Sequence, residues 1–220
     1  MMIGPETFYD VKLRGKSAEE IKKVIARLKR KINELKRKIE HPNYAITMYP
    51  TEDTVIACYR LYIERAKGAL EQMGVSYEPD ASEKRDIEFN YNISSISRLI
   101  FEIRCFSIGW CTVTVEVGDT VRVITENTMP ASLESCVNNN YEIERKDFFK
   151  HLSELHMGEW RRKYDTKRFG IYVLDGYSWK LKIEYNNGVK PFVREGSNSS
   201  PYNFEKMTDA LGVDIYDYLN

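Results

Sequence analysis

A seven-residue repeat near the N-terminus constrains the fold of this chain more than any other feature. Residues 28–34 have the order L-K-R-K-I-N-E, and residues 35–40 repeat it as L-K-R-K-I-E. Apolar side chains recur at three- and four-residue intervals, at Ile21, Ile25, Leu28, Ile32, Leu35 and Ile39. This spacing places one narrow apolar stripe along an α-helix and turns it toward a partner helix. The repeat therefore predicts a helix, a buried seam and a basic outer face together.

Start and stop signals on both sides of the repeat predict a pair of helices. The S-x-x-E sequence that begins at Ser17 has the form of a capping box, and His41-Pro42 disfavours continuation beyond Glu40. A second amphipathic segment runs from Thr51, a capping residue, to Met73, which Gly74 follows. Two helices of similar length joined by a short loop predict a basic, coiled-coil-like antiparallel helical hairpin over residues 1–76.

The rest of the chain, residues 77–220, predicts an antiparallel sheet domain. Apolar and polar residues alternate in several short segments, which is typical of strands with one buried face. These segments begin at Ile87, Leu99, Val113, Val121, Phe169, Trp179 and Val189. We expect a linker at residues 78–83, an exposed loop over residues 127–140, and two helices near residues 147–157 and 202–211. The fold class is therefore α+β, with six or seven strands and two helices packed on the sheet.

Composition and charge narrow the function classes. The chain is 42% hydrophobic and 30% charged, and no apolar run approaches the ~20 residues of a membrane helix, so we expect no membrane association. The N-terminus has no basic region followed by an apolar stretch, which favours a cytoplasmic location. The net charge is zero, but residues 12–40 hold 12 Lys and Arg against 4 Glu. A local positive field therefore survives on a neutral molecule.

The basic face of the first helix is the candidate functional site. With Ile21 at heptad position d, the cations occupy the neighbouring e, f and g positions along one side of the helix. They are Lys22, Lys23, Lys29, Arg30, Lys31, Lys36, Arg37 and Lys38. Such a face can contact several phosphates of a nucleic acid. Solvated basic faces are also common on coiled coils, where long Lys and Arg stems cover the seam, so a purely structural role is the alternative.

Catalytic and metal-binding signatures are weak. The four cysteines form no C-x-x-C pair and are expected to be reduced structural thiols. His151 and His156 are five residues apart, which does not match the i, i+4 spacing of a helical zinc site. No phosphate-binding glycine loop or nucleophile motif occurs in the sequence. The sequence therefore predicts no cofactor, no metal and no catalytic residue.

One short motif points to a different class. The run Glu142-Ile143-Glu144-Arg145-Lys146 has the form E-x-E-x-K and resembles the opening motif of triphosphate-tunnel (CYTH) phosphohydrolases. The resemblance covers five residues and implies that Glu142 and Glu144 bind metal while Lys146 binds phosphate. It also implies a strand that points into a closed barrel. Only 74 residues follow the motif, which is too few for the remaining strands of an eight-stranded tunnel.

A second resemblance covers about a fifth of the chain. From Asp175 onward the sequence follows D-G-x-x-W-x-L-x-I-x-Y-x-x-G and then G-x-N-x-x-P-x-N-F, which ends at Phe204. This pattern resembles a group of uncharacterised small bacterial proteins whose function is unknown. It implies a hairpin followed by the start of a helix, with Asn198 or Asn203 in turn or capping roles, and no activity.

The function expected from the sequence is non-enzymatic binding. The basic face would engage nucleic acid or a nucleic-acid-processing protein complex, and an accessory protein of a bacterium or its mobile elements, including an inhibitor of the anti-CRISPR kind, fits that chemistry. The competing class is a structural module that forms a homodimer through an exposed seam at Ile25, Ile32 and Ile39. A triphosphate-tunnel enzyme is the third alternative.

Overall fold

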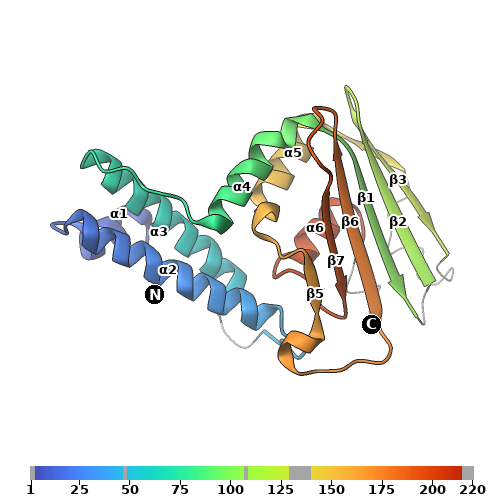
Figure 1. The fold of residues 1–220 in the computed structure, drawn as a ribbon, viewed down its shortest axis with the longest axis horizontal. Coiled ribbons are helices and arrows are strands. Elements are labelled where there is room, and N and C mark those ends of the chain that lie inside the picture. The colour runs from blue at the N-terminus through green and yellow to red at the C-terminus, as the bar shows by residue number, and fades with distance from the viewer. Residues whose placement is uncertain (1–2, 47–48, 107–108, 129–139, 215–220) are drawn as a thin grey trace. The chain divides into compact units, whose positions relative to one another are not determined.

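The computed structural model describes residues 3–46, 49–106, 109–128 and 140–214, and it divides the chain into two compact units. Unit 1 comprises residues 1–79 and is helical in its described part, whereas unit 2, residues 80–220, contains a sheet of seven strands with helices (Figure 1). The chain is therefore an α+β protein, with N-terminal helices that precede the sheet. Each unit is described separately below.

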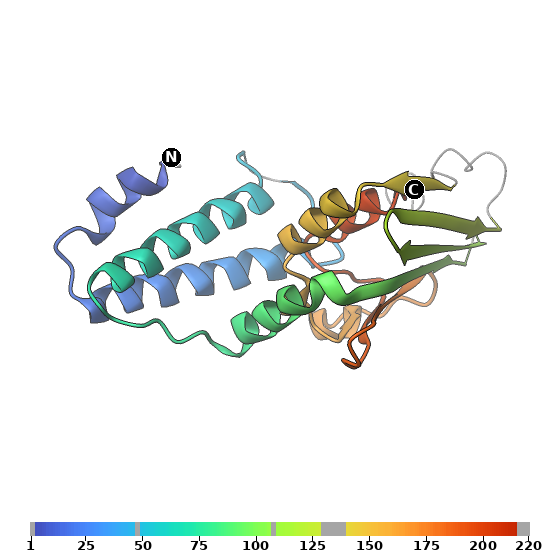
Figure 2. The same cartoon turned by 90° about the horizontal axis from the view of Figure 1, so that it is seen from above.

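Unit 1 is built around the two helices that the repeat predicts. The helices are α2, Ala18–Ile39, and α3, Glu52–Gln72, and they lie side by side (Figures 1 and 2). Ser17 and Glu20 form the capping box, since each side chain accepts a hydrogen bond from the other residue's backbone N–H. Lys38 near the end of α2 contacts Glu52 at the start of α3, so the two helices run antiparallel. The predicted hairpin is confirmed.

The N-terminal residues of unit 1 form a further helical segment that was not predicted from the sequence. It consists of α1, Pro5–Phe8, continued by the π-helical turn η1, Tyr9–Leu13. Phe8 stacks on Tyr62 of α3, with ring centroids 4.1 Å apart. The Tyr62 hydroxyl also donates a hydrogen bond of 2.7 Å to the Ile3 carbonyl. These contacts attach the N-terminal segment to α3, because Phe8 and Leu13 bury their side chains there.

The seven strands of unit 2 form one sheet in the order β4-β3-β2-β1-β6-β7-β5 (Figure 1). All neighbouring pairs are antiparallel except β5 and β7, which are parallel. The strands are β1, Ile96–Cys105; β2, Gly109–Val117; β3, Val121–Asn127; β4, Tyr141–Ile143; β5, Lys163–Asp165; β6, Tyr177–Tyr185; and β7, Phe192–Ser197.

One face of the sheet carries the core of unit 2. Leu99, Phe101 and Ile103 of β1 are fully buried and alternate with more exposed residues. Helices α4, α5 and α6 contribute Phe89, Phe148 and Phe204, among others, to the same apolar cluster. These helices are α4, Ala81–Asn92; α5, Arg145–Glu154; and α6, Phe204–Ala210. Three α-helices therefore pack on the sheet in the described residues, where the sequence predicted two.

Helix α4 replaces the linker and the strand that the sequence predicted at residues 78–93. Asp80 and Glu83 form a capping box at its start, so part of the presumed linker is a helix N-terminus. Phe89 is buried, but Ile87 and Tyr91 are 57% and 84% exposed. The alternation of apolar residues was therefore misleading, because Ile87 and Tyr91 do not share the buried face of Phe89 as they would in a strand.

Two strands predicted near the C-terminus also differ from those in the structure. The predicted strand at residues 169–174 is instead the 3-10 turn η5, Thr166–Phe169, followed by irregular backbone after Gly170, whose φ is 72°. The short strand β5 precedes this segment and was missed. The strand expected at residues 189–193 begins at Phe192 and runs to Ser197. Most of the loop expected over residues 127–140 lies outside the described residues.

The close packing of Gly158 on α4 can be tested through the stability of unit 2. Gly158 lies in the 3-10 turn η4, Met157–Glu159, and a Cβ there would sit 2.4 Å from both the Arg85 carbonyl oxygen and the Asp86 Cα. Because these are backbone atoms, Gly158→Ala should lower the free energy of unfolding by about 1–3 kcal/mol. Denaturant-induced unfolding followed by circular dichroism measures this.

Gly68→Ala is the matched control for that experiment. Gly68 lies inside α3, and a Cβ there meets nothing within 4 Å. Alanine favours the helix, so this variant should be more stable by about 0.5–1 kcal/mol. Equal destabilisation by both substitutions would contradict the packing described for Gly158.

Candidate nucleic-acid interface

Helix α2 carries nine Lys and Arg residues and only three Glu residues. The direction in which the cations point follows from which side of the helix is buried. Ile21, Ile25, Leu28 and Ile32 are buried, and α2 packs on α3. Successive residues of an α-helix are rotated by about 100°. The e, f and g cations therefore form three separate rows, and the prediction that all eight share one side of the helix is too simple.

The e row lies at the edge of the seam and is half-buried. It comprises Lys22, Lys29 and Lys36. Lys22 pairs with Glu19 at 3.2 Å. The Lys29 ammonium lies 5.3 Å from the centroid of the Tyr77 ring, a ring that Lys67 also approaches at 5.1 Å. These cations contribute to packing within unit 1, so they are less suited to an external partner.

The g row is exposed, but its members also contact unit 1. Lys31 lies 5.9 Å from the centroid of the Tyr59 ring. Lys38 forms an ion pair with Glu52, whose side chain is fully buried and also accepts a hydrogen bond of 2.8 Å from the Tyr44 hydroxyl. Burial raises the pKa of Glu52, but the hydrogen bonds from Lys38 and Tyr44 outweigh it, so the pKa lies below its ordinary value. Lys38 therefore has a structural role.

The f row is the part of the basic face that points away from the seam. Lys23, Arg30 and Arg37 are all exposed, and they follow one another every seven residues, or about 10.5 Å along the axis. Arg27, at a c position between Lys23 and Arg30, is exposed as well. Sequence reasoning omitted Arg27 because it considered only positions e, f and g.

These four residues, Lys23, Arg27, Arg30 and Arg37, are called the outer basic row below. None of them forms an ion pair with another described residue of the chain. Glu34 is the one acidic side chain of α2 near the middle of the row, between Arg30 and Arg37. The row can therefore accept several anionic groups that are spaced along its length.

The three seam residues named for a homodimer are not exposed in unit 1. Ile25 and Ile32 are 1% and 6% exposed, and Ile39 is half-buried. Exposure of these three residues in the isolated chain would have favoured the competing structural module. Their burial removes the observation that would have favoured it.

The E-x-E-x-K residues do not lie as the triphosphate-tunnel resemblance implies. Glu142 lies on β4, which stands at the end of the strand order and pairs only with β3 among the described strands. Glu144 follows that strand as the N-cap residue of α5. The two carboxylates therefore do not share a strand, and the described strands form an open sheet.

Glu142 instead belongs to a row of alternating charges on the face of the sheet opposite the core. The register places Glu142 beside Arg122, Arg122 beside Glu116, and Glu116 beside Arg98. Arg98 in turn pairs with Glu184 of β6. Opposite charges on neighbouring strands stabilise a sheet modestly. This row is a structural feature, because each charge has an opposite neighbour.

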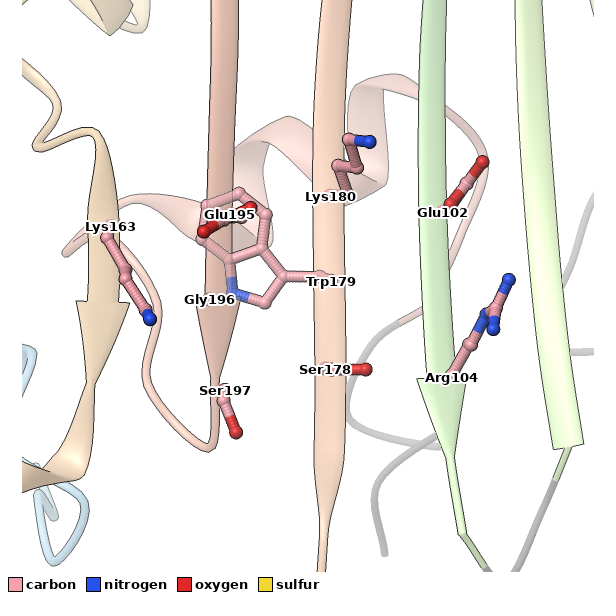
Figure 3. A pocket seen from close by; sticks show the side chains of 9 residues that line it. All are labelled: Glu102, Arg104, Lys163, Ser178, Trp179, Lys180, Glu195, Gly196 and Ser197. Carbon is pink, nitrogen blue, oxygen red and sulfur yellow. The ribbon is translucent and has the colours of Figure 1, made fainter.

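A hollow of about 420 Å³ on the same side of unit 2 is lined by charged side chains of both signs (Figure 3). Glu102, Lys180, Glu195 and Lys163 come from four adjacent strands and alternate in sign. Its floor is the Trp179 ring, which packs on Gly196, where a Cβ would lie 2.2 Å from the Trp179 Nε1. Arg104 also lines the hollow, so three cations face two carboxylates and the excess is one positive charge.

A group of potential metal ligands lies where η4 meets α4. Ligand atoms of Asp86, His156 and Glu159 lie within 4.8 Å of one another. Asp86 is buried, and its carboxylate accepts a hydrogen bond of 3.2 Å from the Gly158 amide and contacts His156 Nδ1 at 2.7 Å. These contacts hold η4 against α4, so Asp86 and His156 have a structural role without a metal ion. Sequence reasoning missed it because 70 residues separate Asp86 from His156.

The two asparagines of the C-terminal pattern, Asn198 and Asn203, form hydrogen bonds with other residues of unit 2. Asn198, whose φ is 51°, accepts a hydrogen bond of 2.8 Å from the Tyr177 amide. Asn203 accepts one of 3.1 Å from the Trp160 ring and donates one of 2.7 Å to the Leu155 carbonyl. Asn198 therefore supports a turn, whereas Asn203, although at the N-cap position of α6, holds two distant segments together.

Comparison with known proteins adds no identification: no protein family, no curated protein and no solved structure matches this chain. Among the described residues, no helix is both long and apolar enough to cross a membrane. The function must therefore be argued from the geometry of the chain itself.

The ion pair between half-exposed Lys38 and buried Glu52 predicts an asymmetry between its two partners. Lys38→Met leaves the Glu52 carboxylate buried with the Tyr44 hydroxyl, and should cost about 3–5 kcal/mol in the free energy of unfolding of unit 1. Glu52→Gln leaves a neutral amide and a half-exposed Lys38 that water can solvate, so it should cost about 1–2 kcal/mol. Denaturant unfolding of both variants tests this order, and equal losses would refute it.

The same pair predicts a dependence on pH. The pKa of Glu52 is lowered in the folded protein, so its ionisation contributes stability that is present above the unfolded pKa of about 4.3. That contribution is lost as the pH falls through the folded pKa. Thermal unfolding between pH 6 and pH 3 should show a smaller decline in the Glu52→Gln variant than in the unaltered protein. Parallel pH profiles would contradict the assignment.

Proposed function

We propose that this protein is a non-enzymatic binding protein that docks on nucleic acid through the outer basic row of α2. The observation that carries the proposal is the exposure of Lys23, Arg27, Arg30 and Arg37 along one side of a rigid helical hairpin. The seam residues and the Lys38–Glu52 pair fix the helix, so the cations need little ordering when they bind.

The chemistry of the row favours phosphate over a more specific target. Duplex DNA presents one charge about every 1.7 Å along its axis, whereas the row spans 14 residues, or about 21 Å. About four phosphates can therefore be contacted at once. The row offers cations and no aromatic side chain, so we expect binding that depends strongly on salt and weakly on sequence.

The proposed setting is the cytoplasm. Cys58 and Cys111 are free thiols in the described part of the chain, which fits a reducing compartment. A protein of this kind would serve as an accessory factor or as an inhibitor of a bacterial nucleic-acid-processing complex, including one of the anti-CRISPR kind. Its affinity for that partner would depend on the positive charges of the outer basic row.

A salt titration tests the proposal. The unaltered protein should bind a 20-base-pair duplex at 50 mM salt, with log K falling against log salt at a slope near −3 to −4 for about four contacts. Replacing Lys23, Arg27, Arg30 and Arg37 together by Gln, which preserves helix propensity, should weaken binding at least about tenfold and bring the slope close to zero. Fluorescence anisotropy measures both quantities.

The matched control removes four exposed cations from unit 2. They are Lys84, Lys146, Lys150 and Lys167. Replacing them by Gln changes the net charge equally and should leave affinity and slope almost unchanged. Absence of binding at low salt, or equal losses in the two variants, would overturn direct nucleic-acid binding. Capture of an acidic protein surface by the row would then remain to be tested with the same variants.

A further inference from the structure

A second cavity in unit 2 differs from the hollow of Figure 3 in charge and in construction. It has a volume of about 210 Å³ and lies between α4, the end of β6 and the start of β7. Its lining combines cationic, aromatic and amide side chains. The lining residues on which the argument depends are Arg85, Phe89, Tyr185, Lys190, Phe192 and Arg194.

Arg194 is the central cation of this cavity, and the fold holds it in place without neutralising it. Its Nε donates a hydrogen bond of 3.2 Å to the Trp160 carbonyl, and its Nη1 donates one of 2.9 Å to its neighbour's carbonyl at Val193. The guanidinium lies 3.7 Å from the centroid of the Phe192 ring. Both hydrogen-bond acceptors are neutral. Among the described residues, no carboxylate forms an ion pair with Arg194.

The surroundings make this positive charge costly. The pKa of Arg194 is lowered to about 10, mainly by burial; the positive charges of Arg85 and Arg162 contribute to the lowering, and Tyr164 and Tyr185 oppose it. Even so, the guanidinium remains protonated at neutral pH. A half-buried cation near two others, without a carboxylate partner, gains more from a bound anion than a solvated cation does.

The balance of charge distinguishes this cavity from the sheet hollow. Arg85, Lys190 and Arg194 face one acidic lining residue, Glu88, which is exposed. The hollow of Figure 3 instead has two carboxylates, Glu102 and Glu195, against its three cations, so its excess is one charge where the cavity has two. The cavity therefore has an excess of positive charge within a small volume, although unit 2 as a whole is acidic.

The rest of the lining is apolar or neutral. The rings of Phe89 and Phe192 meet with centroids 4.9 Å apart, and Val189 and Pro191 add further apolar surface. Burial raises the pKa of Tyr185 to about 12, so its hydroxyl stays protonated and can donate a hydrogen bond. Polar groups that bind an anion thus adjoin surface that binds a ring or a short aliphatic group.

We propose that this cavity binds a small ligand that carries one oxyanion, phosphate or carboxylate, next to a planar or apolar group. Arg194 would contact the oxyanion with the N–H groups that its bonds to Trp160 and Val193 leave available, and Arg85 and Lys190 would add charge. The volume is below the ~300 Å³ at which ordinary ligand pockets begin, which restricts the ligand to a small molecule and excludes a nucleic-acid strand. The site is thus separate from the outer basic row.

Titration calorimetry of the full chain with four probes tests the ligand class. Phenyl phosphate and benzoate each combine an oxyanion with a ring and should bind. Inorganic phosphate, which lacks the ring, should bind at least about tenfold more weakly, and phenol, which lacks the charge, should not bind measurably. The preference between phenyl phosphate and benzoate identifies the oxyanion. No binding of either at millimolar concentration, or equal binding of phenol, would overturn the proposal.

Substitutions then locate the site. Arg194→Gln should weaken binding about tenfold or more. Because Arg194 also bonds to Trp160, the exposed residues provide independent variants: Arg85→Gln and Lys190→Gln should each weaken binding severalfold, whereas Glu88→Gln should strengthen it. The opposite sign expected at Glu88 separates an electrostatic effect from loss of folding.

Two controls complete the experiment. Lys180→Gln removes a cation from the hollow of Figure 3, and the Gln variant of the outer basic row removes four from α2. Neither should change affinity for the probes. Binding that survives Arg85→Gln and Lys190→Gln but is lost in either control would place the anion elsewhere and overturn the proposal. Failure of nucleic-acid binding would leave this result unaffected, so the two proposals are tested independently.

Discussion

Burial of the α2 stripe against α3 is the interaction on which the arrangement of unit 1 depends. A fully buried Ile or Leu side chain contributes about 1.5–3 kcal/mol, whereas an exposed ion pair contributes about 0–1 kcal/mol. The rotation of α2 about its axis is therefore set by Ile21, Ile25, Leu28 and Ile32. The cations occupy whatever directions that rotation leaves, which is why the f positions are exposed and the e positions lie at the seam.

The sequence predicted unit 1 well because its signals are local and mutually consistent. The capping box at Ser17, the stripe of α2 and the stop near Pro42 all specify the same helix. At α4 the local signals disagreed: Ile87, Phe89, Tyr91 and Ile93 alternate as in a strand, while Asp80 and Glu83 form a capping box. Tertiary packing decided for the helix, since Phe89 alone of the first three is buried in the core of unit 2.

The candidate sites also differ in how far they depend on local sequence signals or on tertiary packing. Three members of the outer basic row, Lys23, Arg30 and Arg37, could be predicted from heptad positions, because residues seven apart on one helix share a direction. The structural role of Lys38 could not, since it depends on Glu52 of another helix. The cavity at Arg194 was harder still to predict, because it needs α4, β6 and β7 together. Strand β6 pairs with β1, which lies more than seventy residues earlier in the chain.

The neutral charge of the whole chain does not oppose the two proposed anion-binding surfaces, because fields in solution are short-ranged. The Debye length is about 8 Å at physiological ionic strength. Carboxylates more than a few such lengths from the outer basic row or from Arg194 hardly affect a ligand there, whereas Glu34 and Glu88 lie beside those sites and act on it directly. Long-range steering is therefore weak in this protein, and the affinity of each surface depends on the few charges that touch its ligand.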